Sequence, residues 1–155
     1  LIGFHLPVFR KTKIRKAISR SKYYLFDPGI TNALCERSFV NAKSIVFGNL
    51  FEQFIIMEVR AALEYLEINK KLTYWKSVNK QEVDLIIGVS LAIEIKSTSK
   101  VQEKHFKGLR ALKEEGLITN FMVVSLDEFE QKTTDGIDCY HWEKFLSLLW
   151  SNKLM

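Results

Sequence analysis

The sequence has few of the residues that mark several classes of small protein. Its two cysteines, Cys35 and Cys139, are too few and too far apart for a thiolate zinc site or a disulfide framework. We interpret both as small core residues in a reducing compartment. No apolar run approaches the roughly 18 residues that span a bilayer, and the first residues lack a secretory signal. We therefore expect a cytoplasmic protein without a membrane partner.

Acidic residues are missing from the start of the chain. Residues 1–22 carry seven Lys and Arg side chains and no acid, although the net charge of the whole chain is only +5. A basic segment of this kind favours polyanions, nucleic acid first and an anionic membrane second. The candidate DNA-binding residues are Arg10, Lys11, Lys13, Arg15, Lys16 and Arg20. A solvated linker, or a face that docks an acidic neighbouring domain, would explain the same charge.

Repeats and low-complexity segments are also missing. A chain of 155 residues suits one domain, and about 68 to 70% of the unfolded surface is buried at that size. The chain begins with Leu1 rather than Met, which suggests a fragment of a longer polypeptide. We predict a basic arm or linker over residues 1–21 and a single domain over residues 22–155.

The most informative segment is QEVDLIIGVSLAIEIK, residues 81–96. Its apolar clusters predict two strands joined by a three-residue turn that begins at Gly88. With that turn Asp84 faces Glu94, with Cβ atoms about 4.5 to 5.5 Å apart, where like charges destabilise each other. A cation such as Mg²⁺, which binds carboxylate and phosphate oxygens, would remove that cost. Lys96 points from the same face as Glu94.

An ordinary solvated face of a sheet gives the same pattern. Glu82, Asp84, Glu94 and Lys96 would then point to water, with Lys96 paired to Glu82. A turn one residue shorter would also break the facing of the two acids. The hairpin alone does not separate these alternatives, so a site needs a further residue from another element.

The longest predicted helix, residues 44–68, supplies one more acid. A helical wheel places one apolar stripe on Gly48, Phe51, Ile55, Val59, Ala62, Leu63 and Leu66. Glu52 lies inside that stripe, whereas Gln53, Arg60 and Glu64 fall on the polar side. Buried carboxylates are rare unless they are paired or bound to a metal, so Glu52 is a candidate site residue. Alternatively, it reaches water from the edge of the stripe.

The remaining segments complete an α/β arrangement. We predict strands over residues 22–26, 72–76, 120–126 and 137–141, and helices after Asp27-Pro28 and over residues 101–114 and 142–150. Residues 120–126 are nearly all apolar, which is typical of a strand buried on both faces. His105 is interpreted as a surface residue. The predicted fold is a mixed sheet of four or five strands with helices on both faces.

These residues resemble two related families. Glu52 on a core-facing helix, Asp84 at the end of the second strand of a meander, and Glu94-Ile95-Lys96 on the third strand resemble the PD-(D/E)XK nuclease superfamily, whose core has the order αβββαβ. Val83 stands in place of the proline of the motif. A closer resemblance, to the nuclease-like C-terminal domain of bacterial and archaeal AAA-type ATPases, is carried by LPVFRKTKIRKAISRSKYYLFDPGI, GNLFEQFI, TYWKS, QEVDLII, AIEIKS and DGIDCYHWEKFL.

The resemblance implies a restriction-endonuclease-like fold and a role for each residue. Asp84 and Glu94 would bind Mg²⁺ or Mn²⁺ together with the Ile95 backbone carbonyl, and Glu52 would complete or orient the site. Lys96 would position the attacking water and stabilise negative charge on the scissile phosphate. The closer resemblance also implies an ATPase domain and a winged helix upstream in the same polypeptide. No GxxxxGK[ST] motif occurs in these residues, so nucleotide hydrolysis is not assigned to them.

Two functions from different classes follow. The first is a Mg²⁺-dependent DNA endonuclease, which three acids and one lysine on a strand edge favour. The second is a non-catalytic module that keeps the nuclease fold and docks DNA or a protein partner, because a fold alone does not fix an activity.

Overall fold

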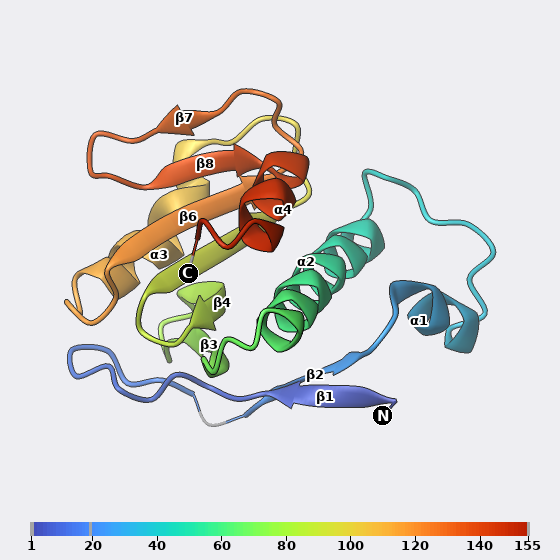
Figure 1. The fold of residues 1–155 in the computed structure, drawn as a ribbon, viewed down its shortest axis with the longest axis horizontal. Helices are drawn as coiled ribbons and strands as arrows, with labels where there is room; N and C mark the ends of the chain where they lie inside the picture. Colours follow the sequence, from blue (N-terminus) through green and yellow to red (C-terminus); the bar gives the residue numbers. More distant parts are fainter. Residues whose placement is uncertain (1, 19, 155) are drawn as a thin grey trace.

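A computed structural model of the chain describes residues 2–18 and 20–154. It contains a six-stranded mixed sheet of order β3-β4-β5-β6-β8-β7 and a two-stranded ribbon, β1-β2 (Figure 1). The strands are β1 Gly3–Leu6, β2 Lys22–Leu25, β3 Leu72–Lys76, β4 Glu82–Ile87, β5 Leu91–Lys96, β6 Asn120–Ser125, β7 Gln131–Lys132 and β8 Asp138–His141. The helices are α1 Pro28–Leu34, α2 Ile45–Tyr65, the 3₁₀ helix η1 Glu103–Phe106, α3 Lys107–Lys113 and α4 Trp142–Trp150. The predicted α/β class is confirmed.

Strands β3, β4 and β5 form an antiparallel meander, as predicted. The β4–β5 turn has three residues, since Ile87 pairs with Leu91, and Gly88 at its start has a φ of 60°, which favours glycine. In this register Asp84 on β4 and Glu94 on β5 follow directly after the last backbone pair. The two acids therefore lie opposite each other.

Strand β6 runs through the middle of the sheet. It is parallel to β5 and to β8, and five of its six residues are buried, as its apolar sequence predicts. The short strand β7 pairs antiparallel with β8. The prediction of four or five strands missed β7, because the two polar residues Gln131 and Lys132 are too few to show a periodic pattern.

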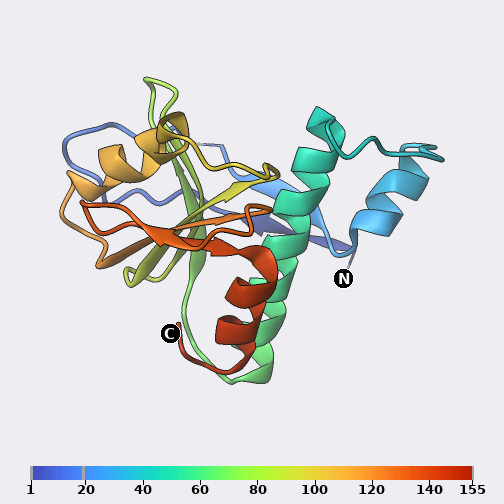
Figure 2. The ribbon, with the colours of Figure 1, turned by 90° about the horizontal axis from the view of Figure 1, so that it is seen from above.

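Helices cover both faces of the sheet, as Figure 2 shows. Helices α2 and α4 pack on one face, over a core that includes Ile55 and Ile93. Helices η1 and α3 pack on the other face, over a core that includes Trp75 and Leu109. The order α2-β3-β4-β5-α3-β6 is the predicted αβββαβ order, although the helix expected over residues 101–114 is divided between η1 and α3.

Helix α2 begins where the sequence predicts, and its outer face is more buried than expected. Ser44 is the N-cap, and its hydroxyl accepts the N–H of Phe47 at 3.1 Å. Gln53, predicted on the polar face, is buried, and its amide donates to the Leu25 carbonyl oxygen at 2.8 Å. The wheel missed this contact because β2 and α1 pack against α2 on the side away from the sheet.

Helix α1 is short and partly exposed. The Asp27 carboxylate caps it by accepting the N–H of Ile30 at 2.9 Å, and Pro28 is its first residue, as predicted. Cys139 is buried, but Cys35 at the end of α1 is exposed, so only one of the two cysteines is a core residue. Among the described residues, no helix has both the length and the apolar composition needed to cross a bilayer.

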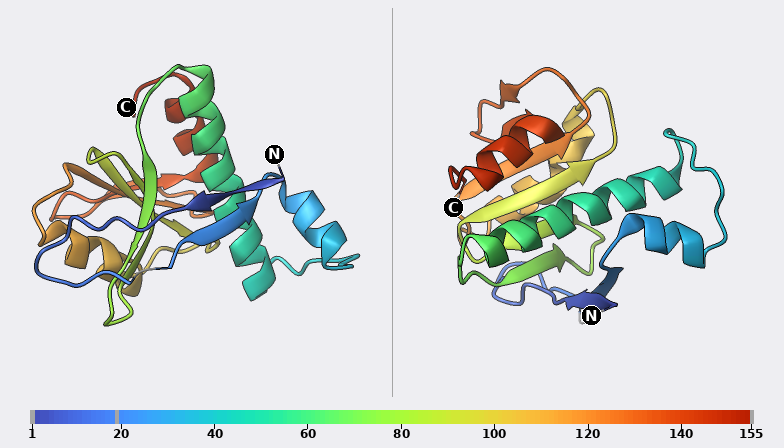
Figure 3. Two further views of the ribbon diagram at one scale, coloured as in Figure 1. Left: turned by 90° about the horizontal axis from the view of Figure 1, so that it is seen from below. Right: turned by 45° about the vertical axis from the view of Figure 1, so that its right-hand side comes forward.

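The N-terminal segment packs onto the domain. Leu6 and Phe9 are only 0% and 4% exposed, one in each core. Backbone hydrogen bonds tie the segment to Tyr74 of β3, and the Glu115 carboxylate accepts the N–H groups of residues 13–15. Figure 3 shows the β1-β2 ribbon alongside α2, with α1 beyond it. The residues predicted as a basic arm or linker therefore pack against the domain through apolar anchors, about which the charge pattern carries no information.

Candidate functional site

Seven charged side chains gather where β4 begins and β5 ends. They come from five elements: Lys22 of β2, Glu52 of α2, Lys76 of β3, Glu82 and Asp84 of β4, and Glu94 and Lys96 of β5. Six ion pairs connect them into one network. The four predicted site side chains, Glu52, Asp84, Glu94 and Lys96, all belong to it.

Strand β4 has a β-bulge next to Asp84. Trp75 of β3 pairs with Val83 of β4. The next pair is Thr73 with Ile86, so two residues of β4 lie opposite one residue of β3. The extra residue changes the alternation, and Val83 and Ile86 both face the α3 core, where a regular strand would place them on opposite faces. Asp84 lies at this irregularity, and the regular β4–β5 register places it opposite Glu94.

Asp84, Glu94 and Lys96 form the inner half of the network. Asp84 Oδ2 accepts the backbone N–H of Ile95 at 2.8 Å and lies 3.6 Å from Lys96 Nζ. Lys96 Nζ is 2.6 Å from Glu94 Oε1. The second oxygen of Glu94, Oε2, is buried and has no hydrogen-bond partner among the described residues. A buried carboxylate oxygen in this state lacks a donor or a cation.

The pKa values of the inner half follow from burial and charge. Burial and the Asp84 carboxylate together raise the pKa of Glu94 to about 8, against the opposing effect of Lys96. Burial, and then the Glu52 carboxylate, also raise the pKa of Asp84. Burial would lower the pKa of Lys96, but Asp84 and Glu94 outweigh it and raise that pKa above its ordinary value. Lys96 therefore keeps its proton, and its single positive charge is shared by the two carboxylates.

Lys22 organises the outer half of the network, which also contains Glu52, Glu82 and Lys76. Lys22 Nζ lies 2.8 Å from Glu52 Oε1 and 2.8 Å from Glu82 Oε1. The same ammonium is 3.8 Å from Asp84 Oδ1, so it joins the two halves. Glu82 Oε2 is 2.5 Å from Lys76 Nζ.

Tyr24, two residues beyond Lys22 on β2, points to the same side of the ribbon. Its hydroxyl donates to the Glu52 Oε1 atom that Lys22 also contacts. Burial would lower the pKa of Lys22, but the Glu52 and Asp84 carboxylates outweigh this effect and raise it. Burial and Glu52 raise the pKa of Tyr24 as well. Both side chains thus keep their protons and act as donors to Glu52.

Sequence reasoning did not find Lys22 and Tyr24 as members of the site. The alternation in KYYL places both on one face of a strand, but it does not show which element faces that strand. The pairing of Glu82 also differs from the solvated-face alternative, which paired it with Lys96. Glu82 contacts Lys22 and Lys76 instead.

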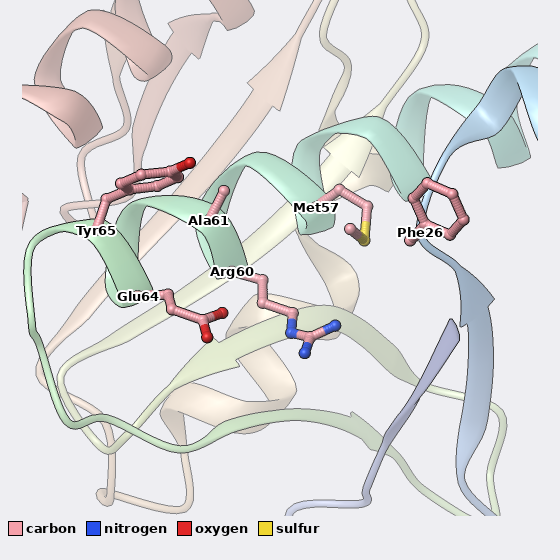
Figure 4. Close-up of a pocket in the computed structure, with 6 residues that line it drawn as sticks. All are labelled: Phe26, Met57, Arg60, Ala61, Glu64 and Tyr65. Carbon is pink, nitrogen blue, oxygen red and sulfur yellow. The ribbon is translucent and has the colours of Figure 1, made fainter. Parts of the chain in front are cut away.

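A cleft of about 390 Å³ opens beside the outer half, and it is lined by Lys22, Tyr23, Tyr24, Asn49, Glu52 and Glu82. A larger pocket of about 710 Å³ lies apart from the network, along α2 near the end of β2 (Figure 4). Its lining is largely apolar, with Arg60 and Glu64 as its charged residues. The cleft at the network is lined by charged and polar groups that also belong to the ion-pair network, so it is the candidate substrate cleft.

The predicted DNA-binding residues lie mostly on the surface. The exposed ones are Arg10, Lys11, Lys13, Lys16 and Arg20. Arg15 is an exception, because its guanidinium forms ion pairs with Glu114 and Glu115 at the end of α3. The segment then passes the end of β3, where the Ile18 N–H donates to the Lys76 carbonyl oxygen at 2.9 Å. The basic segment is thus followed in the sequence by Lys22, which belongs to the acidic network.

A comparison with protein-family models matches residues 47–145 to a family described as a domain of unknown function (DUF4143). The match covers more than half of the 155 residues. The chain belongs to this family. The DUF4143 match contains Glu52, Asp84, Glu94 and Lys96, and it begins after Lys22 and Tyr24. No curated protein and no solved structure gave a significant match.

In this DUF4143 domain, the inner half of the network offers ligands that suit a hard divalent cation. Asp84 and Glu94 present carboxylate oxygens from adjacent strands, and Glu94 Oε2 has no partner among the described residues. Mg²⁺ commonly uses one or two carboxylates and completes its shell with water and phosphate oxygens. Within residues 2–18 and 20–154, no three His, Cys, Asp or Glu side chains are arranged to hold a metal ion by themselves. A cation at this position would be bound by the two carboxylates, and its other ligands would be oxygens of water, of a phosphate or of the backbone.

Proposed function

We propose that this domain hydrolyses DNA phosphodiester bonds with Mg²⁺ or Mn²⁺, as the C-terminal module of an AAA-type ATPase. The proposal rests on the buried Glu94 Oε2 atom without a partner among the described residues, next to Asp84 and Lys96. The resemblance of these residues to the PD-(D/E)XK motif supplies the reaction class. The element order α2-β3-β4-β5-α3-β6 supports the same assignment.

Asp84 and Glu94 would hold the cation, with the Ile95 backbone carbonyl as a further ligand. The Ile95 N–H fixes Asp84 Oδ2 and so holds the carboxylate in one orientation, with Oδ1 on the side of Lys22. A bound Mg²⁺ lowers the pKa of a coordinated water and polarises the phosphoryl oxygen.

Lys96 would act through its charge and not as a base. The Asp84 and Glu94 carboxylates raise its pKa, so the ammonium holds its protons through the reaction. An ammonium has three donors, and the contacts with Glu94 and Asp84 leave one of them for the attacking water or a phosphate oxygen. Lys96 would therefore position the water and offset the charge of the transition state.

Glu52 would orient the site from the outer half. Its Oε1 atom accepts from Lys22 and Tyr24, so it fixes the ammonium that lies beside Asp84 Oδ1. This role differs from direct metal ligation, which the resemblance also allows for Glu52.

A non-catalytic docking module is the second candidate, and one observation favours it. Lys22, Lys76 and Lys96 already pair with the four acids, so much of the negative charge is compensated by the chain itself. In this function the acids and lysines would only stabilise the fold, while the basic segment contacts DNA or a partner domain.

The test is incubation of supercoiled, linear, single-stranded and branched DNA with the purified chain in Mg²⁺, Mn²⁺ or chelator. We expect metal-dependent cleavage and a loss of about 100-fold or more in Asp84→Ala, Glu94→Ala and Lys96→Ala, the scale of removing one transition-state contact. Glu128→Ala and Lys144→Ala are matched controls, since both residues are exposed and lie outside the network. Cleavage that survives Lys96→Ala would indicate a contaminating nuclease, and no cleavage of any substrate would favour the docking module.

A further inference from the structure

The Lys22 ammonium has the surroundings of a bound cation. Carboxylate oxygens of Glu52 and Glu82 lie 2.8 Å from Nζ, and Asp84 Oδ1 lies at 3.8 Å. The ammonium also lies over the ring of Tyr74, 5.0 Å from the ring centre, which adds a cation–π contact. Three acids from two elements thus converge on one positive charge.

We infer that Lys22 is a tethered counter-ion that fills a second cation position in the network. With Lys22 present, the domain binds one divalent ion, at Asp84 and Glu94. When the charge of Lys22 is removed, Glu52 and Glu82 take up a second ion. The first ion rests on the proposed function, whereas the second position rests on the contacts of Lys22 alone.

Lys22 and a metal ion exclude each other at this position. A divalent ion bound to Glu52 Oε1 or Glu82 Oε1 would lie about 2.0 to 2.2 Å from an oxygen that already contacts the ammonium. The ion and the ammonium would then share one carboxylate oxygen at short range, and their mutual repulsion would favour the loss of one of them. The tethered ammonium has the advantage of high effective concentration.

The ammonium cannot easily leave the position. Lys22 begins β2, whose four residues pair with β1, so the backbone below the side chain is fixed. The Glu52 and Asp84 carboxylates keep it charged. The neighbouring cleft, lined by Tyr24 and Asn49 among others, gives ions from solvent a route to Glu52 and Glu82. Access is therefore available, and the charge of Lys22 is what prevents a second ion from binding.

The experiment is a Mn²⁺ titration of the full chain, followed by calorimetry and by the electron paramagnetic resonance signal of free Mn²⁺. We expect Lys22→Met to bind one more Mn²⁺ per chain than the wild type does. Adding Glu52→Gln to that variant should remove the additional ion, because it removes a carboxylate ligand. Lys76→Met is the matched control. Lys76 contacts the other oxygen of Glu82, Oε2, and its loss leaves Lys22 in place.

Folding and the proposed function are tested separately. Lys22→Gln keeps a side-chain donor for Glu52 without the charge, so it carries the test if Lys22→Met does not fold, and it should also gain one ion. Equal numbers of ions in the wild type and in the folded neutral variant would overturn the inference. The number bound by the wild type reports on the proposed function: no bound ion would overturn the site at Asp84 and Glu94, whether or not the variants gain one.

Discussion

Asp84 and Glu94 are buried to a similar extent, 4% and 7% exposed, but their partners differ. Asp84 accepts the Ile95 N–H and lies near two lysines. Glu94 contacts Lys96 through one oxygen, and its other oxygen has no partner among the described residues. Glu94 is therefore the acid whose charge the fold compensates least, which agrees with a pKa raised to about 8 by burial and by Asp84.

Glu94→Gln should stabilise the metal-free protein. Because the pKa of Glu94 rises from 4.5 to about 8 on folding, the folded chain binds this proton more tightly, and wild-type stability falls as the pH rises through that range. The amide removes this loss. At a pH of about 8 we expect the free energy of unfolding to increase by at least about 1 kcal/mol, a rise in Tm of roughly 2 to 4 °C. Thermal melts in chelator at a pH of about 5 and about 8 measure this difference.

The same melts with millimolar Mg²⁺ separate a metal ligand from a structural residue. A cation that binds only the folded state should raise the wild-type Tm and leave that of Glu94→Gln unchanged. Glu128→Gln is the matched control, because Glu128 is exposed and lies outside the network. If Glu94→Gln destabilises the chain at both pH values and the wild type does not respond to Mg²⁺, Glu94 is only an acceptor for Lys96.

The residues of the site were predictable to the extent that local geometry fixes them. A three-residue turn sets the β4–β5 register, so the facing of Asp84 and Glu94 could be read from the hairpin. The contact of Lys22 with Glu52 joins residues 30 positions apart and depends on how the β1-β2 ribbon docks on α2. No periodicity in either segment encodes that docking.

At the scale of elements, the long periodic segments were predictable and the irregular ones were not. Helix α2 and the meander follow from apolar spacing and capping residues. The bulge opposite Tyr74 leaves no signal in a pattern of period two, although it places Val83 on the same face as Ile86. The close approach of α3 to β4 was also missed, because it depends on one glycine, Gly108, in a segment with mixed apolar and basic residues.

Gly108→Ala should separate α3 from the start of β4. A Cβ atom at Gly108 would lie 1.8 Å from the Glu82 backbone oxygen, which cannot rotate away. We expect a loss of about 1 to 3 kcal/mol, the usual cost of overpacking, together with weaker DNA cleavage, because Glu82 is a partner of Lys22. Urea denaturation measures the change in stability.

Gly48→Ala is the control for this change. Gly48 is also in a helix, but its new Cβ would meet only the Ser97 Oγ atom, at 3.2 Å, and that side chain can rotate. Alanine is the better helix former by about 1 kcal/mol, so Gly48→Ala should be neutral or stabilising. A wild-type urea midpoint for Gly108→Ala would mean that α3 moves away from β4 at no cost, and that the spacing of these elements does not support the network.

At the scale of the whole molecule, basic and acidic groups are adjacent. The N-terminal segment packs along β3 and reaches the acidic network at Lys22, whereas Arg10 and Lys11 lie near Gly88 at the β4–β5 turn. The excess of positive charge was evident from the sequence, but the docking of the segment was not, because it depends on single anchors such as Phe9 and Glu115. Removing the segment would also remove part of both cores, so its function has to be tested by substitution.

Duplex DNA binding should depend strongly on salt and on this segment. If about five of its exposed cations neutralise phosphates, the slope of log K against log salt should be near −4.5, at about −0.9 for each contact. The double variant Lys11→Ala/Lys16→Ala should reduce the slope by about 1.8. Lys144→Ala/Lys153→Ala, an equal loss of exposed charge at the other end of the chain, should leave the slope unchanged. Fluorescence anisotropy over a range of salt concentrations gives all three slopes. If the two double variants have the same slope, the phosphates are not bound by the N-terminal segment, and its cations are available for an acidic surface of an upstream domain instead.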